Sequence, residues 1–527
     1  MKALSRFITK FTSVIVGVLS CFDRVIFKGH LALAAPCELE YFVDRVLKVR
    51  RSDFMKTLAP HYSDQLVDHA QNWARKAART YEYRTGQFRK DQWAQGLIRN
   101  QRISQGLVGV LCTLETCPSF ALVPGPQRPQ FVSRNRQQRV LYYYFLDPQF
   151  GLIHVRLQTW LPFTVQVYVN GHEWLAQQMV RTKLGFVQQH NAFTQLDDPV
   201  QAQRLADRFV QLDWPKILDR WAEQVNPLLR KLLPGYPVHW VVDQAEYATD
   251  LLFQSRAALA GLYRALLDYA VRTFTPKDVL CFLGRKWDRR FDGEVHTEFE
   301  DDRWFGTRIK HRMRTNWLKM YDKFGSILRI ETVINSPKEF WIYRKRQHRD
   351  GKSSLGYYPM TKSVASLADY QAQALACNRR YLDALAVVDD PTPAYQDLRQ
   401  LTEPKVVAGR SYAGFNPARR EDLRLFLGVL DGDHIARGFR NQDIRKPLWL
   451  IRCSREMSAR SRPRPYNRAR GGHRIGWSGA GSTGDARQHP GDHRRRQVLR
   501  GGSPPPLARG CPLPPLRFGR GCQAGPG

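Results

Sequence analysis

Residues Gly306 to Asn335, GTRIKHRMRTNWLKMYDKFGSILRIETVIN, predict two antiparallel strands that are joined by a tight turn. Side chains of opposite character alternate along the first strand, where polar and aromatic residues recur at every second position: Trp317, Lys319, Tyr321 and Lys323. The second strand alternates in the same way, with Arg329 and Glu331 between apolar neighbours. A period of two is typical of a strand with one buried face. The stretch therefore predicts a β-hairpin with charged groups on one face.

The length of the turn decides which side chains face one another. A three-residue loop, Phe324-Gly325-Ser326, pairs Tyr321 with Arg329, Lys319 with Glu331 and Met320 with Ile330. A two-residue loop shifts the register by one and places Lys319 against Ile330. Because a shift of one residue moves every side chain to the other face, the three-residue loop is favoured.

The hairpin face carries groups that are suited to phosphodiester chemistry. A tyrosine hydroxyl can attack a phosphodiester and form a phosphotyrosine link, while cations hold the phosphate. A carboxylate can hold Mg²⁺ or Mn²⁺, or can act as a base. We therefore expect Tyr321, Glu331 and Glu246 to be catalytic. The alternative is structural: a cross-strand pair between Lys319 and Glu331, with Tyr321 packed as an aromatic.

A second candidate segment is Gln244-Ala245-Glu246-Tyr247-Ala248-Thr249-Asp250. It is predicted to lie between a strand, Val238–Ala245, and a helix that begins near Thr249 and ends near Thr273. In that position Glu246 and Asp250 lie one helical turn apart. Together with Glu331 they are predicted to hold a divalent cation. The alternative is that these carboxylates stabilise the N-terminus of the helix.

Two further groups of polar residues are interpreted as structural. Asp23 and Arg24 lie inside an apolar strand and are interpreted as a buried ion pair. Asn170 precedes Gly171-His172-Glu173, and this order is typical of a helix N-cap.

The formal net charge of +34 and the pI near 10.1 predict a polyanionic partner, DNA or RNA. Basic residues beside glycine turns and on the predicted strands are the expected contacts: Arg285, Lys286, Arg308, Lys310, His311, Lys319, Lys323, Arg329, Arg344, Lys345 and Arg346. The longest apolar run near the start is too short to cross a membrane. The cysteines do not show the spacing of a zinc site and are typical of reduced thiols, so a cytoplasmic protein is expected.

The order of predicted elements indicates an α+β fold made of two α+β units with mainly antiparallel sheets. Residues 1–233 form the first expected domain and residues 234–390 the second. Residues 391–452 are expected to form a linker and a truncated helix-turn-helix or winged-helix region.

Residues 453–527 contain fifteen arginines and no lysine, with many glycines and prolines. This composition predicts a disordered tail, which we interpret as the product of a shifted reading frame. The alternative is an arginine-rich arm that binds RNA. Subtracting the tail's charge of +12 from +34 leaves the body at +22.

The order Gly-Thr-Arg (306–308), Lys-Met-Tyr-Asp-Lys (319–323) and Leu-Arg-Ile-Glu (328–331) resembles the core of plasmid and phage rolling-circle replication initiators. Closest are plasmid initiators that lack the double-histidine motif and carry Gly-Ser-Arg, Tyr-Asp-Lys and Arg-x-Glu. The resemblance implies a metal-dependent nick that is made by a tyrosine. It leaves open whether Tyr321 or Tyr247 is the nucleophile.

Over residues 20–450 the chain is also similar to an uncharacterised bacterial family of mobile elements. The shared motifs are FDRVIFKGHL, WLPF, NGHEWLA, QAEYATDLLF, GTRIKHRM, KMYDKFG, LRIET and GRSYAGFNP. Its members are often labelled MarR-like or winged-helix regulators. We therefore expect a DNA-binding protein of a mobile or plasmid-derived element with transposase-like nicking activity. The alternatives are a non-catalytic winged-helix transcriptional regulator and an inactive, decayed copy.

Overall fold

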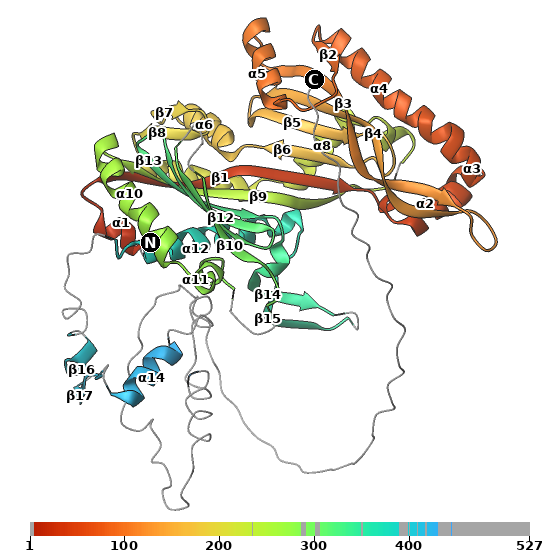
Figure 1. Ribbon diagram of the computed structural model, residues 1–527. Coiled ribbons are helices and arrows are strands. Elements are labelled where there is room, and N and C mark those ends of the chain that lie inside the picture. Colours follow the sequence, from red (N-terminus) through yellow and green to blue (C-terminus); the bar gives the residue numbers. More distant parts are fainter. Residues whose placement is uncertain are drawn as a thin grey trace, which may run out of the picture. The chain divides into compact units, whose positions relative to one another are not determined.

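The computed structural model describes residues 5–233, 235–285, 291–300, 306–348, 351–388, 399, 401–407, 409–416, 419–429 and 444. Within these residues the fold is α+β, as expected, and is built on one large sheet with the strand order β10-β11-β12-β13-β9-β1-β6-β5-β4-β3-β2. All neighbouring pairs are antiparallel except β2 and β3. The long strands β1 and β9 lie side by side through the middle of the sheet (Figure 1).

The strands of the large sheet are β1 (Ile15–His30), β2 (Thr80–Tyr83), β3 (Gly106–Val123), β4 (Gln130–Asp147), β5 (Gly151–Gln158), β6 (Val165–Val169), β9 (His239–Phe253), β10 (Val295–Glu300), β11 (Arg308–Met313), β12 (Asn316–Lys323) and β13 (Ile327–Ile334). Three two-stranded sheets add β7 (Phe186–Gln189) with β8 (Ala192–Leu196), β14 (Trp341–Gln347) with β15 (Ser353–Pro359), and β16 (Lys405–Val407) with β17 (Arg410–Tyr412).

The α-helices are α1 (Arg6–Lys10), α2 (Pro36–Tyr41), α3 (Arg51–Asp53), α4 (Ala59–Lys76), α5 (Lys90–Gln101), α6 (Gly171–Arg181), α7 (Pro199–Ala206), α8 (Trp214–Val225), α9 (Leu228–Lys231), α10 (Arg256–Thr273), α11 (Pro276–Phe282), α12 (Leu367–Leu385) and α14 (Arg420–Val429). Short 3-10 or π segments are η1 (Ala32–Ala34), η2 (Phe42–Leu47), η3 (Phe54–Leu58), η4 (Asp207–Gln211), η5 (Pro337–Glu339) and η6 (Val364–Ser366).

The two halves of the large sheet repeat the same connectivity. In the first half, the long strand β1 is followed by helices and the short edge strand β2, which has no counterpart in the second half. Strands β3, β4, β5 and β6 then run back from beside β2, and β6 pairs with β1. In the second half, β9 is followed by α10 and α11 and then by β10, β11, β12 and β13, which return to pair with β9. Because β1 and β9 are antiparallel neighbours, the halves are related by a pseudo-two-fold axis between them. The two expected units therefore share one sheet.

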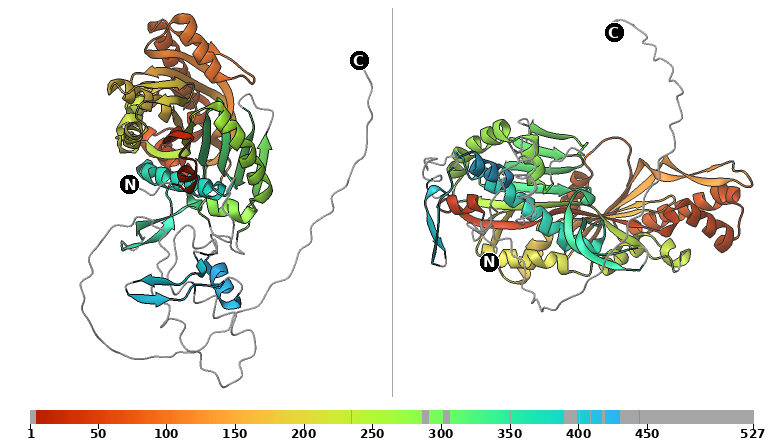
Figure 2. Two further views of the ribbon diagram at one scale, coloured as in Figure 1. Left: turned by 90° about the vertical axis from the view of Figure 1, so that its left-hand side faces the viewer. Right: turned by 90° about the horizontal axis from the view of Figure 1, so that it is seen from below.

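The large sheet has two different faces in its second half. Thr332 on β13 donates to Asn378 of α12, and His311 on β11 contacts Tyr381 of the same helix. Their neighbours in sequence, Glu331 and Lys310, point to the opposite face because side chains alternate along a strand. We call the side that is covered by α12 the helix face, and the other side the polar face. The right-hand view of Figure 2 shows β3 and β4 as a long hairpin at the opposite end of the sheet.

The predicted hairpin register is confirmed. Residues Lys319 and Glu331, Met320 and Ile330, and Tyr321 and Arg329 are cross-strand partners between β12 and β13. The connection is the expected three-residue loop, in which Phe324 and Gly325 have φ of 58° and 77°. A glycine tolerates this left-handed conformation without a steric penalty, which explains its position in the turn.

The predicted helix from Thr249 is wrong at its start, because β9 continues to Phe253 and α10 begins only at Arg256. Residues 245–253 are buried throughout, and a central strand that is covered on both faces does not need alternating polarity. Glu246 and Asp250 therefore lie four residues apart on one face of a strand, and not on successive turns of a helix. Residues Leu367–Leu385 form α12, which covers the helix face.

The expected winged-helix region is represented only in part. Helix α14 lies within the expected region 391–452, whereas residues 430–443 and 445–527, which include the Arg-rich tail, lie outside the described residues. In the described part of the chain, no helix combines the length and the apolar character that a membrane span requires.

Candidate active site

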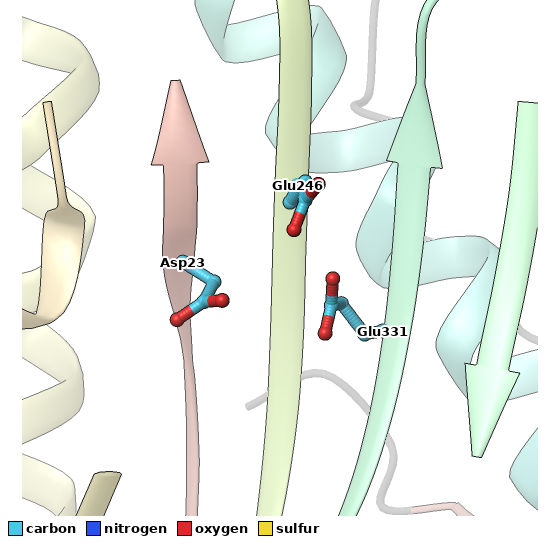
Figure 3. Close-up of side chains that lie close together, drawn as sticks. All are labelled: Asp23, Glu246 and Glu331. Carbon is cyan, nitrogen blue, oxygen red and sulfur yellow. The ribbon is translucent and has the colours of Figure 1, made fainter. Parts of the chain in front are cut away.

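Three carboxylates from three neighbouring strands meet on the polar face, close to the pseudo-two-fold axis. Asp23 comes from β1, Glu246 from β9 and Glu331 from β13, and their side chains turn toward one another (Figure 3). One oxygen of each lies within 4.8 Å of the others. All three residues are buried, with 8%, 6% and 1% of their surface exposed. We call these residues the carboxylate cluster.

A β-bulge brings Asp23 into this cluster. Phe22 pairs with Tyr247 and Arg24 pairs with Glu246, so β1 has one more residue than β9 at this point, and that residue is Asp23. A bulge reorients the side chain of the extra residue and is common beside functional sites. Gly171, the first residue of α6, packs against the bulge, since a Cβ there would lie 2.3 Å from the carbonyl oxygen of Phe22.

Glu331 has a different partner on each of its two oxygens. The Lys319 ammonium lies 2.8 Å from Oε1, and the Tyr321 hydroxyl donates to Oε2 at 2.6 Å. The Lys319 ammonium also lies 3.7 Å from Oε2 of Glu246, so it interacts with both carboxylates. The cross-strand pair between Lys319 and Glu331 that was considered as the structural alternative is therefore present, and Tyr321 contacts the same carboxylate.

The two glutamates have opposite proton affinities. Burial and the negative charge of Glu331 together raise the pKa of Glu246 to about 8. Burial also opposes ionisation of Glu331, but the Lys319 ammonium prevails and lowers the pKa of Glu331 to about 2. At neutral pH Glu331 is therefore a carboxylate that accepts hydrogen bonds, whereas Glu246 retains a proton. Neighbouring carboxyl groups whose pKa values are driven apart are typical of acid–base pairs.

Tyr321 is partly buried, and its hydroxyl keeps its proton. Burial and the charge of Glu331 raise the pKa of Tyr321 well above its usual value. The phenolate is therefore not formed in advance. If this oxygen acts as a nucleophile, its proton has to leave during the attack, and Glu331 is in hydrogen-bond distance to take it.

Arg329 holds the predicted ligand Asp250 away from the carboxylate cluster. Its Nε and Nη2 lie 2.6 Å from Oδ1 and Oδ2 of Asp250, and Nη1 lies 3.3 Å from Asp23. It also donates to the carbonyl oxygen of Asn191 at 2.7 Å and lies 3.1 Å from Nε2 of His172. Burial acts to raise the pKa of Asp250, but the Arg329 charge prevails and lowers it to about 2. Two of the three predicted metal ligands, Glu246 and Glu331, come together, and the third position is occupied by Asp23.

Lys323 is buried at the end of the same face. Its ammonium contacts the side-chain oxygen of Asn191, in the turn between β7 and β8. Burial and the nearby Arg329 charge lower the pKa of Lys323 to about 8. Lys319, Lys323 and Arg329 are thus enclosed and already partnered, and they do not form the open cationic surface that the sequence suggested.

The other basic residues that were predicted to bind nucleic acid do not lie together. Arg308 pairs with Glu300, and Lys310 pairs with Glu298 and lies over Trp317. His311 is fully buried on the helix face, where burial lowers its pKa to about 4. Arg285 pairs with Glu339, and Lys286 lies outside the described residues. Arg344, Lys345 and Arg346 lie on β14, whose ribbon with β15 carries exposed side chains.

The rival nucleophile Tyr247 lies on the other face of β9. It is 1% exposed, its ring packs against Phe22, and its hydroxyl donates to the carbonyl oxygen of Ser20. Because adjacent residues of a strand point in opposite directions, Tyr247 faces away from Glu246. Of these two tyrosines, Tyr321 is the one that contacts the carboxylate cluster.

The sequence interpretation of Asp23 and Arg24 as one buried ion pair does not match the structure. Asp23 contacts Arg329, and Arg24 lies 3.8 Å from Glu246. A charged residue inside an apolar strand was the available signal, but the partner lies in a distant segment. The predicted cap is confirmed, since Asn170 accepts hydrogen bonds from the amides of His172 and Glu173.

Comparisons with protein family models, with curated proteins and with solved structures found no match. A functional assignment has to come from the chemistry of the carboxylate cluster and its surroundings.

Proposed function

We propose that the protein is a metal-dependent enzyme of a mobile or plasmid-derived element that nicks DNA with a tyrosine. The observation that carries this proposal is the 2.6 Å contact between the Tyr321 hydroxyl and Glu331, inside a group of three convergent carboxylates. The same hairpin is the segment that resembles the rolling-circle replication initiators.

The donor set fits Mg²⁺ or Mn²⁺, because both ions prefer carboxylate oxygens. Asp23, Glu246 and Glu331 would hold the ion. The fit is supported by geometry, since one oxygen of each carboxylate lies within 4.8 Å of the others, on three neighbouring strands. When bound, a divalent ion polarises a phosphate oxygen and lowers the barrier to attack.

The chemical step that follows is a transesterification. The Tyr321 oxygen attacks the phosphorus of a phosphodiester, and its proton passes to Oε2 of Glu331. A bond forms between the tyrosine oxygen and phosphorus, and the bond from phosphorus to one bridging sugar oxygen breaks. The departing oxygen takes a proton from water, which leaves one DNA end attached to Tyr321 and the other free. Lys319 keeps Glu331 ionised, so that Oε2 accepts the hydrogen bond from the Tyr321 hydroxyl and orients it.

The β14–β15 ribbon supports a nucleic-acid partner. One face of the ribbon exposes Trp341, Tyr343 and Tyr357, with 44%, 61% and 44% of their surfaces accessible. Lys345 lies on the same face and Arg346 on the other, by strand alternation. Aromatic rings beside cations are the combination that binds single strands, through base stacking and phosphate contact. With the body charge of +22, DNA is the favoured polyanion, and RNA is the second choice.

The activity is tested with supercoiled plasmid and Mn²⁺. The wild-type protein is expected to produce open circles and a covalent adduct that mass spectrometry maps to Tyr321. Tyr321→Phe should lower nicking by at least about 1,000-fold. The control Tyr247→Phe, on the helix face, and the control Tyr41→Phe, at an exposed position, should both retain it. A wild-type protein that leaves the plasmid supercoiled would remove the enzymatic proposal.

The second candidate is a non-catalytic DNA-binding regulator with a C-terminal winged helix. It is favoured by the fact that Lys319, Lys323 and Arg329 are buried and paired, as in a network that only holds strands together. In that case the protein binds DNA without cleavage, and deletion of residues 410–452 abolishes binding. Translating the coding DNA beyond codon 453 in three frames would test the inactive-copy alternative, since a winged helix in another frame identifies the tail as an artefact.

A further inference from the structure

A second site lies on the other half of the sheet, in a pocket of about 560 Å³. Strands β1, β3, β4, β5 and β6 contribute to its wall. Its cationic side chains are Lys28, Arg134 and Arg156, beside the imidazole of His30, and among the described residues that line the pocket none is a carboxylate. The remaining polar groups are hydroxyls and amides. A concave surface with this composition is complementary to an anion.

Two of these cations are available for a ligand. Among the residues that the structure describes, Lys28 and Arg134 make no ion pair and no hydrogen bond through their side chains. Arg156 is different, since it lies 2.8 Å from Glu115 just behind the wall. Burial and the charge of Lys28 lower the pKa of His30, although the Asp243 carboxylate opposes this shift.

The wall of the pocket is held by internal hydrogen bonds. Gln158 donates to the carbonyl oxygens of Pro118 and Leu161 at 2.9 and 3.1 Å, and Ser119 donates to Leu161 at 3.0 Å. These bonds tie β3 and β5 to the segment before β6. The cations are therefore presented on a preformed surface, which reduces the cost of ordering them when a ligand binds.

The pseudo-two-fold axis relates this pocket to the Tyr321 site. Arg156 pairs with Gln166 across β5 and β6 as Tyr321 pairs with Arg329 across β12 and β13. Lys28 pairs with Gln166 as Asp250 pairs with Arg329. At these matched positions the second half holds Asp250 and Tyr321 where the first half holds Lys28 and Arg156. Lys28 lies on the same face of β1 as Arg24, about 13 Å further along the strand.

We propose that this pocket holds a phosphate group of the same nucleic-acid strand that is presented to Tyr321. This inference rests on the proposed function, because the occupant is taken to be a nucleic-acid strand that crosses the polar face from the first half of the sheet to the second. A strand that is anchored by Lys28 and Arg134 passes Arg24 at the axis before it reaches the carboxylate cluster. Lys28 and Arg134 contribute to the binding and positioning of the nucleic-acid strand, and not to the chemical step.

The test measures binding of a fluorescein-labelled single-stranded 20-mer DNA to the full chain by anisotropy. The Tyr321→Phe background without Mn²⁺ prevents cleavage, so the result does not depend on catalysis. The double variant Lys28→Ala/Arg134→Ala should weaken binding by about tenfold or more and lower the salt slope by about one. The control Arg45→Ala/Lys56→Ala removes the same charge from exposed helical positions outside the pocket and should have a clearly smaller effect.

Two further measurements are needed. One checks that the variants are folded, and the other tests whether the pocket binds free phosphate instead of a nucleic-acid strand. Lys28→Arg/Arg134→Lys should restore most of the affinity, and a thermal unfolding curve should be the same for both double variants. Inorganic phosphate and a nucleoside monophosphate should compete with the 20-mer only at much higher concentration. Equal strand affinity in the pocket variant and the charge-matched control would overturn the inference. Tight binding of free phosphate that is lost in the pocket variant, with unchanged strand affinity, would also overturn it.

Discussion

Arg329 and Asp23 are 306 positions apart in the chain, yet Nη1 of Arg329 lies 3.3 Å from Oδ1 of Asp23. The contact joins β13 to the bulge in β1 across the intervening strand β9. It connects the carboxylate cluster to the buried pair between Arg329 and Asp250. The candidate site is therefore part of the charge network that holds the middle of the sheet, and stability and function can be tested at the same residues.

Removal of the Arg329 guanidinium should be strongly destabilising. Arg329→Met leaves Asp250 and Asp23 buried without their cation, which is expected to lower the free energy of unfolding by about 3–5 kcal/mol. Denaturant unfolding measures the loss. The matched control is Arg346→Met on the exposed ribbon, where a change of within about 0.5 kcal/mol is expected. Equal stabilities of the two variants would show that the buried pair contributes little.

The pH dependence of stability should reveal the proton on Glu246. Its pKa is raised from 4.5 to about 8 in the folded state, so this group favours folding at low pH and the contribution is lost as pH rises toward 8. Relative to Glu246→Gln, the wild-type protein should lose up to about 1.4 kcal/mol per pH unit between pH 6.5 and 8. Buried His311, with its pKa lowered to about 4, changes stability below that window. If the free energy of unfolding depends on pH in the same way in both proteins, Glu246 does not retain a proton in the folded state.

Divalent metal binding should release a proton from the carboxylate cluster. Mn²⁺ at one hundred times its dissociation constant should raise the free energy of unfolding by about 2.7 kcal/mol. At pH 7 about one proton should leave Glu246, which titration calorimetry in buffers of different ionisation enthalpy measures. Asp23→Asn and Glu246→Gln should abolish both effects. Asp243→Asn serves as the control, since Asp243 pairs with Lys362 and not with the cluster.

Two glycines in helices should respond to alanine in opposite directions. At Gly171 a Cβ would lie 2.3 Å from the carbonyl oxygen of Phe22, so Gly171→Ala should push the bulge and cost about 1–3 kcal/mol. At Gly96 in α5 nothing lies within 4 Å of the added Cβ, and Gly96→Ala should stabilise the protein by about 0.5–1 kcal/mol. Gly171→Ala should also weaken Mn²⁺ binding because Asp23 is displaced. A neutral result at Gly171 would mean that the bulge adapts freely.

The hairpin could be predicted from the sequence because its determinants are local. Alternation along β12 and β13 and the three-residue turn with Gly325 specify the register, so the pairing of Lys319 with Glu331 follows from the pattern. The hydrogen bond from Tyr321 to Glu331 was not predicted, because the pattern places Tyr321 opposite Arg329. The extension of β9 could not be predicted in this way. Residues 245–253 are buried on both faces although they include Glu246, Thr249 and Asp250, so their sequence shows no clear period that separates strand from helix.

The sequence by itself determined the α+β class, the basic character and the hairpin with its charged face, because periodicity, composition and turn chemistry act over short segments. The tertiary structure alone decided that Asp23 joins Glu246 and Glu331, that Asp250 is held by Arg329, and that Tyr247 faces the helices. Those outcomes depend on the pairing of β1 with β9 and on a one-residue bulge. Pairing between segments more than 200 residues apart is selected by the packing of the whole sheet, which no local pattern records.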